Sequence, residues 1–384
     1  MTTVQKQKER IELITGNEAV AHAARLARPK VVAAYPITPQ TKIVETLSEM
    51  IANGDLDAEF IAVESEHSAM GAAIGASLGG VRTFTATSSH GLLYMGELVW
   101  WAGMTRIPIV MPVVNRSLNP WNIWPDHQDS MAFRDAGWLQ FYGKNNQEVL
   151  DLTLCAFKIS EHQKISMPSM IALDGFILSH TSAQVNIPHQ SDVDDFLPPF
   201  KPLAKLDPDN PFAHGSLTDS KGIWEQRMSL IDGFENAKVI IPKVFQEYKD
   251  KFGRLGKEMV EITGNLDEAE IAVVALGTLG EEAEKAIEYL GNKGIKAAVV
   301  RPRVFRPFPT EEIINALRQV SKVLIIDRAV SFGHAGQLAL EIQAEFYVNK
   351  IDIPIYPIIR GLGGMDVSYV DIANEVEKIH KEDH

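Results

Sequence analysis

The chain has 384 residues, 45% hydrophobic and 23% charged, which is enough for two or three domains with ordinary cores and excludes disorder as the main state. Its net charge of −13 argues against a broad nucleic-acid-binding surface, but it is compatible with a local basic pocket for an anionic substrate. The single cysteine, Cys155, excludes a disulfide scaffold, and an iron–sulfur cluster held by this chain alone, and it favours a reducing, cytoplasmic setting.

Residues 1–16 are polar and lack the apolar core of a secretion signal. No run of about 18 apolar residues follows anywhere in the chain, so we expect no membrane-spanning segment.

Strand-like and helix-like patterns alternate over residues 18–179, as in α/β folds. Short apolar or β-branched runs predict strands at residues 30–35, 59–63, 81–87, 107–114 and 168–173. Helical patterns occupy residues 71–80, 91–103 and 147–162. We expect a parallel sheet with ligand-binding groups at the carboxyl ends of its strands.

Prolines interrupt residues 186–220, where apolar periodicity is lost, so we expect a connector lying over a surface. Residues 221–257 then look helical and suit a bridge between two domains. A second, smaller doubly wound sheet follows over residues 269–379. Its predicted strands are 270–276, 295–301, 322–327 and 353–359, and its helices are 279–292, 310–320 and 336–348. The expected division is therefore 1–185, 186–260 and 261–384.

The first motif, Tyr-Pro-Ile-Thr-Pro-Gln-Thr, follows the strand at residues 30–35. Pro36 and Pro39 fix the backbone on either side of Ile37 and Thr38, which presents the Thr38 hydroxyl rigidly at the sheet edge. An ordinary strand-to-helix turn, with Thr38 or Thr41 as the helix N-cap, would have the same sequence.

The second motif, Glu-Ser-Glu-His-Ser-Ala-Met over residues 64–70, precedes a run of small residues that permits close approach of a flat ligand. A partly buried carboxyl group there would have its pKa raised by desolvation. Acidic residues also favour helix N-termini for purely structural reasons, so both interpretations stay open.

Two further motifs follow strand ends. Ser88 and Ser89 lie in Thr-Ser-Ser-His-Gly, which suits either an anion or cofactor pocket or a capping turn. Arg116 follows the buried strand at 107–114, where it suits a carboxylate clamp or a surface ion pair. The spacing of Asp126, His127 and Asp129 is poor for a zinc site, so we expect a structured loop near an active site and no metal.

These four motifs, in this order and at these strand ends, resemble the α subunit of the 2-oxoacid:ferredoxin oxidoreductases, with the pyruvate enzymes as the closest match. The resemblance covers nearly the whole chain. Its second half adds Arg301-Pro302-Arg303, Phe308-Pro309, Asp327-Arg328 and Gly361-Leu362-Gly363-Gly364. No Walker loop, Gly-x-Gly-x-x-Gly turn or Gly-Asp-Gly diphosphate motif is present, so the phosphates of any cofactor must be held elsewhere.

The resemblance implies a thiamine diphosphate enzyme of several chains, which decarboxylates a 2-oxoacid oxidatively, reduces ferredoxin and forms an acyl-CoA from coenzyme A. The α subunit supplies a pyrimidine-binding domain and a transketolase C-terminal-like domain, both α/β with doubly wound parallel sheets. A β subunit holds the diphosphate, its Mg²⁺ and a cluster. The [4Fe-4S] clusters lie on partner subunits, with γ and δ subunits or fused equivalents completing the complex.

The resemblance also implies roles for individual residues. Glu66 matches the catalytic glutamate that hydrogen-bonds the cofactor pyrimidine and favours its imino tautomer, which removes the thiazolium C2 proton. Thr38 and Arg116 match residues that bind the substrate carboxylate. Pro36, Ile37, Ser88 and Ser89 match positions that line the cofactor and substrate pocket. His90 stands where many relatives have glutamine.

Pyruvate is the substrate that the resemblance favours, because Thr38 stands where the oxalate enzymes tend to have arginine. Branched-chain 2-oxoacids and 2-oxoglutarate remain alternatives. A non-catalytic scaffold subunit is the alternative from a different class, and the presence of Glu66, Thr38 and Arg116 argues against it.

Overall fold

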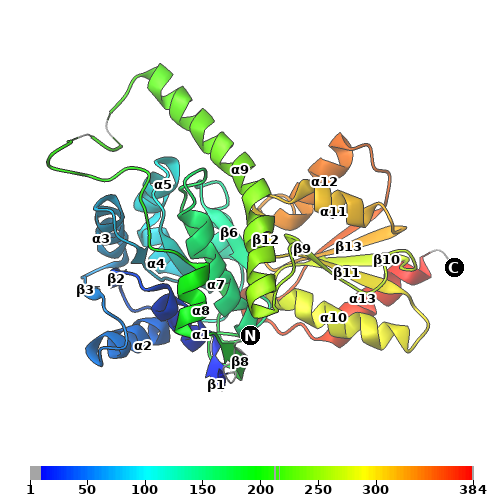
Figure 1. The fold of residues 1–384 in the computed structure, drawn as a ribbon. Helices are drawn as coiled ribbons and strands as arrows, with labels where there is room; N and C mark the ends of the chain where they lie inside the picture. The colour runs from blue at the N-terminus through cyan, green and yellow to red at the C-terminus, as the bar shows by residue number, and fades with distance from the viewer. Residues whose placement is uncertain (1–9, 212, 216, 383–384) are drawn as a thin grey trace, which may run out of the picture.

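Buried parallel strands organise the chain into two α/β bodies in a computed structural model that describes residues 10–211, 213–215 and 217–382. The first body holds a seven-stranded sheet and the second a five-stranded sheet, and they lie side by side (Figure 1). A small antiparallel pair, β1 (Arg10–Thr15) with β8 (Ser182–Ile187), flanks the first body. The α/β class with two largely parallel sheets is therefore confirmed.

The seven-stranded sheet has the order β12-β6-β7-β5-β4-β2-β3, and only β12 runs antiparallel to its neighbour. Its strands are β2 (Val31–Ala34), β3 (Glu59–Ala62), β4 (Thr83–Phe84), β5 (Val110–Asn115), β6 (Leu139–Tyr142), β7 (Ser169–Asp174) and β12 (Val304–Arg306).

Both faces of this sheet are covered, which explains why its central strands are continuously apolar. On β5, Val110 and Val114 face one core, whereas Met111 and Val113 face the other. The first core is covered by α1 (Gly16–Ala27), α2 (Thr41–Ala52) and α7 (Asn146–Ser160). The second core is covered by α3 (Glu66–Leu78), α4 (Ser89–Tyr94) and α5 (Gly96–Met104).

The five-stranded sheet of the second body has the order β14-β13-β10-β11-β9, with β9 antiparallel. Its strands are β9 (Val260–Thr263), β10 (Ile271–Ala275), β11 (Ala297–Pro302), β13 (Lys322–Asp327) and β14 (Ile355–Ile359). Helices α10 (Gly277–Gly291) and α13 (Tyr369–Lys381) cover one face, and α11 (Thr310–Leu317) and α12 (Gln337–Val348) cover the other.

Several elements differ from the sequence-based expectation. The helix expected over residues 91–103 is divided at Met95 into α4 and α5. The expected strand at 81–87 is reduced to the two residues of β4. Strands β1, β6, β9 and β12 and helices α1, α2 and α13 were not predicted. Most of these strands are short, and their pairing partners are distant in sequence, so local periodicity carries little signal for them.

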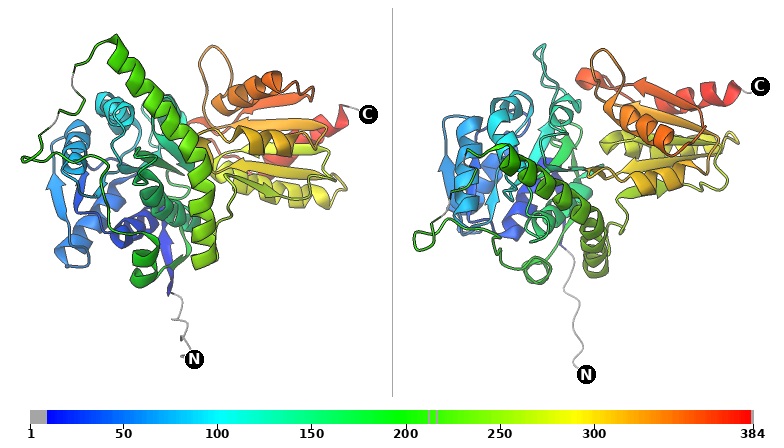
Figure 2. Two further views of the ribbon diagram at one scale, coloured as in Figure 1. Left: turned by 45° about the horizontal axis from the view of Figure 1, so that its top comes forward. Right: turned by 90° about the horizontal axis from the view of Figure 1, so that it is seen from above.

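The segment expected to be a connector, residues 186–220, contains a short helix that the sequence did not indicate, α8 (Gln190–Phe196). This short helix buries only Val193 and Phe196, too few positions to give a visible period. The helix expected next is present as α9 (Ser220–Phe252), capped by Asp219 and ended by Gly253 at a positive φ of 71°. Its first turns project beyond the first body (Figure 2).

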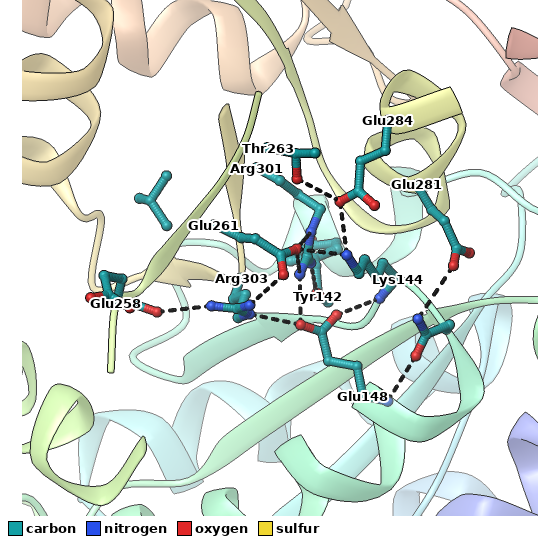
Figure 3. Close-up of polar contacts among 12 residues, drawn as sticks. Tyr142, Lys144, Glu148, Glu258, Glu261, Thr263, Glu281, Glu284, Arg301 and Arg303 are labelled. Atoms are coloured by element: carbon teal, nitrogen blue, oxygen red, sulfur yellow. Dashed lines mark hydrogen bonds and ion pairs between the residues drawn. The ribbon is translucent and has the colours of Figure 1, made fainter. Parts of the chain in front are cut away.

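The two bodies are joined by a buried ion cluster, which consists of Glu148 on α7, Arg301 on β11, Glu261 on β9, Arg303 and Lys144 (Figure 3). Arg301 is fully buried and donates to Glu148 Oε1 and Glu261 Oε2, each at 2.6 Å. Arg303 donates to the same two carboxylates at 2.8 and 2.7 Å. Two carboxylates and two guanidinium groups therefore form a closed ring across the joint.

Electrostatics within this ion cluster favour the charged forms. Burial by itself would raise the pKa of Glu261, but Arg301, Arg303 and Lys144 lower it to about 2. The same two arginines overcome the burial of Glu148 and hold its pKa below the usual range. Because the folded pKa values are depressed, the stabilisation is present above pH 4.5 and is lost as the pH falls towards 2.

No helix in the described part of the chain is long and apolar enough to cross a membrane.

We predict that Glu148→Gln lowers the free energy of unfolding by about 3–5 kcal/mol, because it leaves buried Arg301 without one of its two counter-charges. Denaturant titration of the purified chain measures the change. The control is Glu268→Gln, which removes the same charge from the solvent-exposed pair with Lys296 and should leave the midpoint unchanged. Equal losses in the two variants would contradict a structural role for the ion cluster.

Candidate active site

The carboxyl ends of β2, β3, β4 and β5 bring the four sequence motifs to one edge of the seven-stranded sheet, because these strands are parallel. The Arg116 Nη1 atom donates to the Thr38 carbonyl oxygen at 2.9 Å, which joins the first and fourth motifs. The Glu66 side chain lies against Gly91, which joins the second and third. The predicted residues therefore do converge.

Hydrogen bonds from buried polar side chains fix the loop that carries Thr38. Gln40 donates to the Ala86 carbonyl at 2.9 Å, and Asn17 donates to the Pro39 carbonyl at 2.7 Å. Gln40, not Thr38 or Thr41, is the N-cap residue of α2, and it makes no side-chain capping bond. The capping interpretation is thus wrong for both threonines, and Thr38 is exposed at the sheet edge.

The two glutamates of the second motif have different surroundings. Glu64 is exposed and accepts a 2.6 Å hydrogen bond from the Ser68 hydroxyl, which lowers the pKa of Glu64. Ser65 caps α3 by accepting from the Ser68 amide. Glu66, the first residue of α3, is only 8% exposed. The Glu66 carboxylate is therefore buried in the site, whereas the Glu64 carboxylate, two residues before α3 begins, lies in solvent.

Gly91 lies against the Glu66 carboxylate because it has no side chain. A β-carbon at Gly91 would stand 2.7 Å from Glu66 Oε1 and 2.6 Å from the Thr87 hydroxyl oxygen. The Thr87 hydroxyl is buried and has no hydrogen-bond partner among the residues that the structure describes. The absence of a side chain at Gly91 therefore leaves space for the Glu66 Oε1 atom and the Thr87 hydroxyl oxygen, which both lie next to it.

The hydroxyls of Ser88 and Ser89 are fully buried and connect neighbouring segments. Ser88 donates to the Val114 carbonyl and Ser89 to the Ser117 carbonyl, each at 2.7 Å. Ser89 has a positive φ of 47° at the start of α4. Both side chains thus hold the ends of β4 and β5 together, with their protons directed to backbone oxygens.

Arg116 is 7% exposed and is held by carbonyl oxygens, with no acid in an ion pair with it in the described part of the chain. Its Nε donates to the Asn122 carbonyl at 2.8 Å, and Nη1 donates to Thr38. Burial lowers the pKa of the guanidinium. The group therefore keeps its charge available on the remaining side, as a carboxylate-binding arginine requires.

Asp129 is the buried residue that sequence reasoning missed as a part of this site. Its Oδ2 accepts from the backbone amides of Ser89 at 2.9 Å and Arg116 at 3.0 Å. Its Oδ1 accepts from the Asn115 side chain and the Ser130 amide. From the sequence, Asp126, His127 and Asp129 were interpreted as a poor zinc site and as part of a structured loop near an active site, without a role for Asp129 itself.

A cleft of about 1100 Å³ opens beside Arg116, between the two bodies. The segment from Arg116 to Gln128 forms one wall, and the second body contributes Val330, Phe332, Leu362 and Gly363. Gly363 donates its amide to Asp126 and accepts from Asn122 through its carbonyl. The glycine-rich turn of the second body is thus docked on the loop that follows Arg116.

A second buried cluster, around Asp174, also holds the two bodies together. Asp174, at the end of β7, accepts from Thr278 at the start of α10 and contacts His127 and Arg328 at 2.9 and 3.0 Å. Burial opposes ionisation of Asp174, but Arg328 and His127 hold its pKa far below the usual range. Residues from both bodies therefore share one buried charge.

His90 contacts the outer part of the loop that follows Arg116. Its ring stacks on Trp121 with centroids 4.2 Å apart, and Nε2 contacts the Asn119 side chain. The ring Nδ1 lies 3.1 Å from the Ser89 hydroxyl. The imidazole thus connects α4 to the loop that follows Arg116.

Comparison with known families places both bodies in the same group of proteins. Residues 22–246 match a family described as "Pyruvate flavodoxin/ferredoxin oxidoreductase, thiamine diP-bdg". Residues 269–372 match "Pyruvate:ferredoxin oxidoreductase core domain II".

Two relatives align over almost their whole length. The pyruvate synthase subunit PorA of Methanothermobacter thermautotrophicus is 45% identical over 369 residues, which cover 96% of this chain and 95% of that protein. The ketoisovalerate oxidoreductase subunit VorA of Pyrococcus horikoshii is 44% identical over 372 residues, with 96% and 94% covered. Their nearly equal identities leave the substrate undecided.

Solved structures share the fold at lower identity. A 2-oxoglutarate:ferredoxin oxidoreductase from Magnetococcus marinus superposes with a TM-score of 0.73 at 20% identity, over 97% of this chain and 65% of that chain. A split-gene transketolase superposes with a TM-score of 0.55 at 14% identity, over 96% of this chain and 98% of that chain. These matches confirm the predicted thiamine-enzyme fold.

We predict opposite effects from two identical substitutions on neighbouring helices. Gly91→Ala should destabilise the chain by about 1–3 kcal/mol, because the new methyl group collides with Glu66 and Thr87. Gly75→Ala, in the middle of α3 with no atom within 4 Å, should stabilise it by about 0.5–1 kcal/mol. Chemical denaturation measures both, and a neutral Gly91→Ala would show that Glu66 does not lie where the structure has it.

Proposed function

This chain belongs to the 2-oxoacid:ferredoxin oxidoreductase family, as its α subunit, and we propose that Glu66 activates thiamine diphosphate while Thr38 and Arg116 bind the 2-oxoacid carboxylate. The observation that carries the proposal is the convergence of a buried, inward-facing carboxylate and a carbonyl-anchored guanidinium at one sheet edge. Both groups lie at the carboxyl ends of parallel strands, where α/β enzymes bind their ligands.

The residues around Glu66 fit a thiamine pyrimidine ring. Small side chains follow Glu66 on α3, and Gly91 makes room for the Glu66 carboxylate itself. The Glu66 carboxylate accepts no hydrogen bond within the described part of the chain, so it is available to a ligand nitrogen. The sequence has no Gly-Asp-Gly diphosphate motif, and no group of three His, Cys, Asp or Glu side chains among the described residues is placed to hold a metal ion. We therefore propose a β subunit as the source of the diphosphate site and its metal.

In the mechanism, thiamine diphosphate supplies the carbon nucleophile and the electron sink for decarboxylation. Glu66 holds a proton at the pyrimidine ring nitrogen, and its burial strengthens that hydrogen bond. Arg116 offers charge to the substrate carboxylate, and the exposed Thr38 hydroxyl offers a second donor. Anchoring of Arg116 by the Thr38 and Asn122 carbonyls orients the substrate ketone relative to the cofactor.

Pyruvate is the proposed substrate, with coenzyme A as co-substrate, acetyl-CoA and CO₂ as products and ferredoxin as the reversible electron partner. A relative named for pyruvate and the coenzyme A bound in the Magnetococcus enzyme support this choice. A branched-chain 2-oxoacid is the second candidate, since the ketoisovalerate relative is as similar. 2-Oxoglutarate is the third.

The complex that we propose is cytoplasmic and contains partner subunits that carry Mg²⁺ and [4Fe-4S] clusters. The relatives are named as subunits, and the lone cysteine of this chain cannot hold a cluster. Within the chain, we assign residues 1–185 to the pyrimidine-binding domain, 186–260 to the connector with its bridging helix, and 261–384 to the transketolase C-terminal-like domain.

We predict that the chain, reconstituted with its partner subunits, reduces a viologen dye with pyruvate, and that kcat/KM for pyruvate exceeds that for 2-oxoisovalerate and 2-oxoglutarate. Arg116→Ala should lower kcat/KM by about 10- to 150-fold through loss of a charged hydrogen bond. Thiamine diphosphate affinity should barely change. The chain alone is the blank and should be inactive.

A higher kcat/KM for a branched-chain acid would replace pyruvate as the substrate. No turnover of any 2-oxoacid by a correctly assembled complex would favour the scaffold role. If Arg116→Ala changed kcat/KM by less than about twofold, Arg116 would not be the residue that binds the substrate carboxylate.

We predict that Glu66→Gln slows hydrogen–deuterium exchange at C2 of the bound cofactor by about 10²–10⁴-fold, because the amide is a poor proton partner for the pyrimidine nitrogen. The change is nearly isosteric, so assembly should survive. Glu64→Gln is the matched control, since Glu64 is exposed and bonded to Ser68. Slow exchange in the control with normal exchange in Glu66→Gln would mean that the wrong glutamate has been named.

A further inference from the structure

We propose that Asp129 is a positioning residue, whose carboxylate sets the place of the substrate-binding Arg116 relative to the loop that packs on Glu66. This inference rests on the proposed function of Arg116 and Glu66, and it extends that function to a residue that touches neither ligand. Asp129 lies on the short helix α6 (Gln128–Ala132).

Each oxygen of the carboxylate serves two donors. Oδ2 accepts from the Ser89 and Arg116 amides at 2.9 and 3.0 Å, and Oδ1 accepts from the Asn115 side chain at 2.7 Å and the Ser130 amide at 2.8 Å. Asp129 is fully buried, so no water competes for these bonds. One rigid group thereby ties the ends of two strands.

The two amides on Oδ2 belong to different halves of the active site. Ser89 begins α4, the helix whose Gly91 lies against Glu66 Oε1. Arg116 begins the segment that forms one wall of the cleft. Because Oδ2 is shared, the distance between the Ser89 and Arg116 amides is fixed by a single atom. Displacement of the Asp129 carboxylate must therefore move Arg116 relative to α4 and Glu66.

The other contacts in this region do not replace the carboxylate. Ser88 and Ser89 connect the same strands through their hydroxyls, but they bind the Val114 and Ser117 carbonyls and leave the Arg116 amide to Asp129. The Arg116 side chain is anchored separately by Asn122 and Thr38. The backbone of Arg116 thus depends on Asp129.

Charge on Asp129 is also sensitive to pH near neutrality. Burial raises the pKa of this carboxyl to about 6, although hydrogen bonds from Asn115, Arg116 and Ser89 oppose the shift. The titratable groups that act on it are Asp126 in the same loop, the Arg116 guanidinium, and Tyr142 on β6. Protonation places a hydrogen on an oxygen that faces two N–H donors, so one of these bonds must weaken.

The test uses Asp129→Asn in the assembled complex. Asp129→Asn removes the negative charge that the Ser89 and Arg116 amides share and leaves them at most a neutral amide oxygen, so their hydrogen bonds weaken whichever way the asparagine is turned. We expect KM for the 2-oxoacid to rise by about tenfold or more while kcat changes by less than about threefold. Amide exchange at residues 89 and 116, followed by mass spectrometry, should become faster.

Asp327→Asn is the matched control. Asp327 is also buried, its pKa is also raised to about 6 by burial, and its carboxylate also accepts from two backbone amides, Leu338 at 2.9 Å and Ala339 at 3.1 Å. These amides start α12, which covers one face of the sheet in the second body. The control should speed amide exchange at residues 338 and 339 and leave KM unchanged.

Wild-type complex provides a measurement that needs no variant. KM for the 2-oxoacid should rise as the pH falls through about 6, because Asp129 then becomes protonated, and this dependence should be absent from Asp129→Asn. An unchanged KM in Asp129→Asn, or a pH-independent KM in wild type, would overturn the proposal. If no 2-oxoacid is oxidised, the proposed function fails instead, and exchange at residues 89 and 116 still decides whether Asp129 holds the two segments.

Discussion

The buried ion cluster of Glu148, Glu261, Arg301 and Arg303 is the contact on which the arrangement of the two bodies depends. Arg301 comes from the sheet of the second body and Glu148 from a helix of the first, so displacing either residue breaks a buried ion pair between the two bodies. The chain then continues into β12, which pairs with β6 and adds a strand from the second half of the sequence to the first sheet. Together these contacts hold the glycine-rich turn at residues 361–364 against the loop after Arg116, and thereby define the cleft.

At the edge of the seven-stranded sheet, buried polar contacts also fix the position of neighbouring segments. Every loop that carries a functional side chain is fixed by buried hydrogen bonds to its neighbours, through Gln40, Ser88, Ser89 and Asp129. Buried polar groups in proteins are normally satisfied, and these obey that rule. Several buried polar atoms near the site lack a partner among the described residues, including the Thr87 and Ser117 hydroxyls and the Asn115 side-chain oxygen. The Glu66 carboxylate next to Thr87 also receives no hydrogen bond from the described residues. A site that is rigid around uncommitted oxygens is preorganised for a ligand that supplies the missing donor.

Motif order and strand-end position determined much of this from the sequence. Thr38, Glu66 and Arg116 follow predicted strands, and parallel strands must deliver such residues to one edge. The central strands were predictable because both their faces are buried, which makes residues such as Val110 to Val114 continuously apolar. The single cysteine and the missing diphosphate motif also set what this chain cannot do alone.

Only the tertiary structure distinguished Glu66 from Glu64 by environment, because that difference depends on which side of α3 meets Gly91. It alone gave Asp129 a role, since the four donors to its carboxylate come from residues up to 40 positions away from Asp129 in the chain. It also showed that the Ser88 and Ser89 hydroxyls bind backbone carbonyls, which no local pattern encodes. Strand β12 was not predicted for the same reason, because its three residues form a strand only by pairing with β6, more than a hundred positions earlier. Periodicity records which face of an element is buried, whereas the partners of a buried polar group are set by chain segments that only folding brings together.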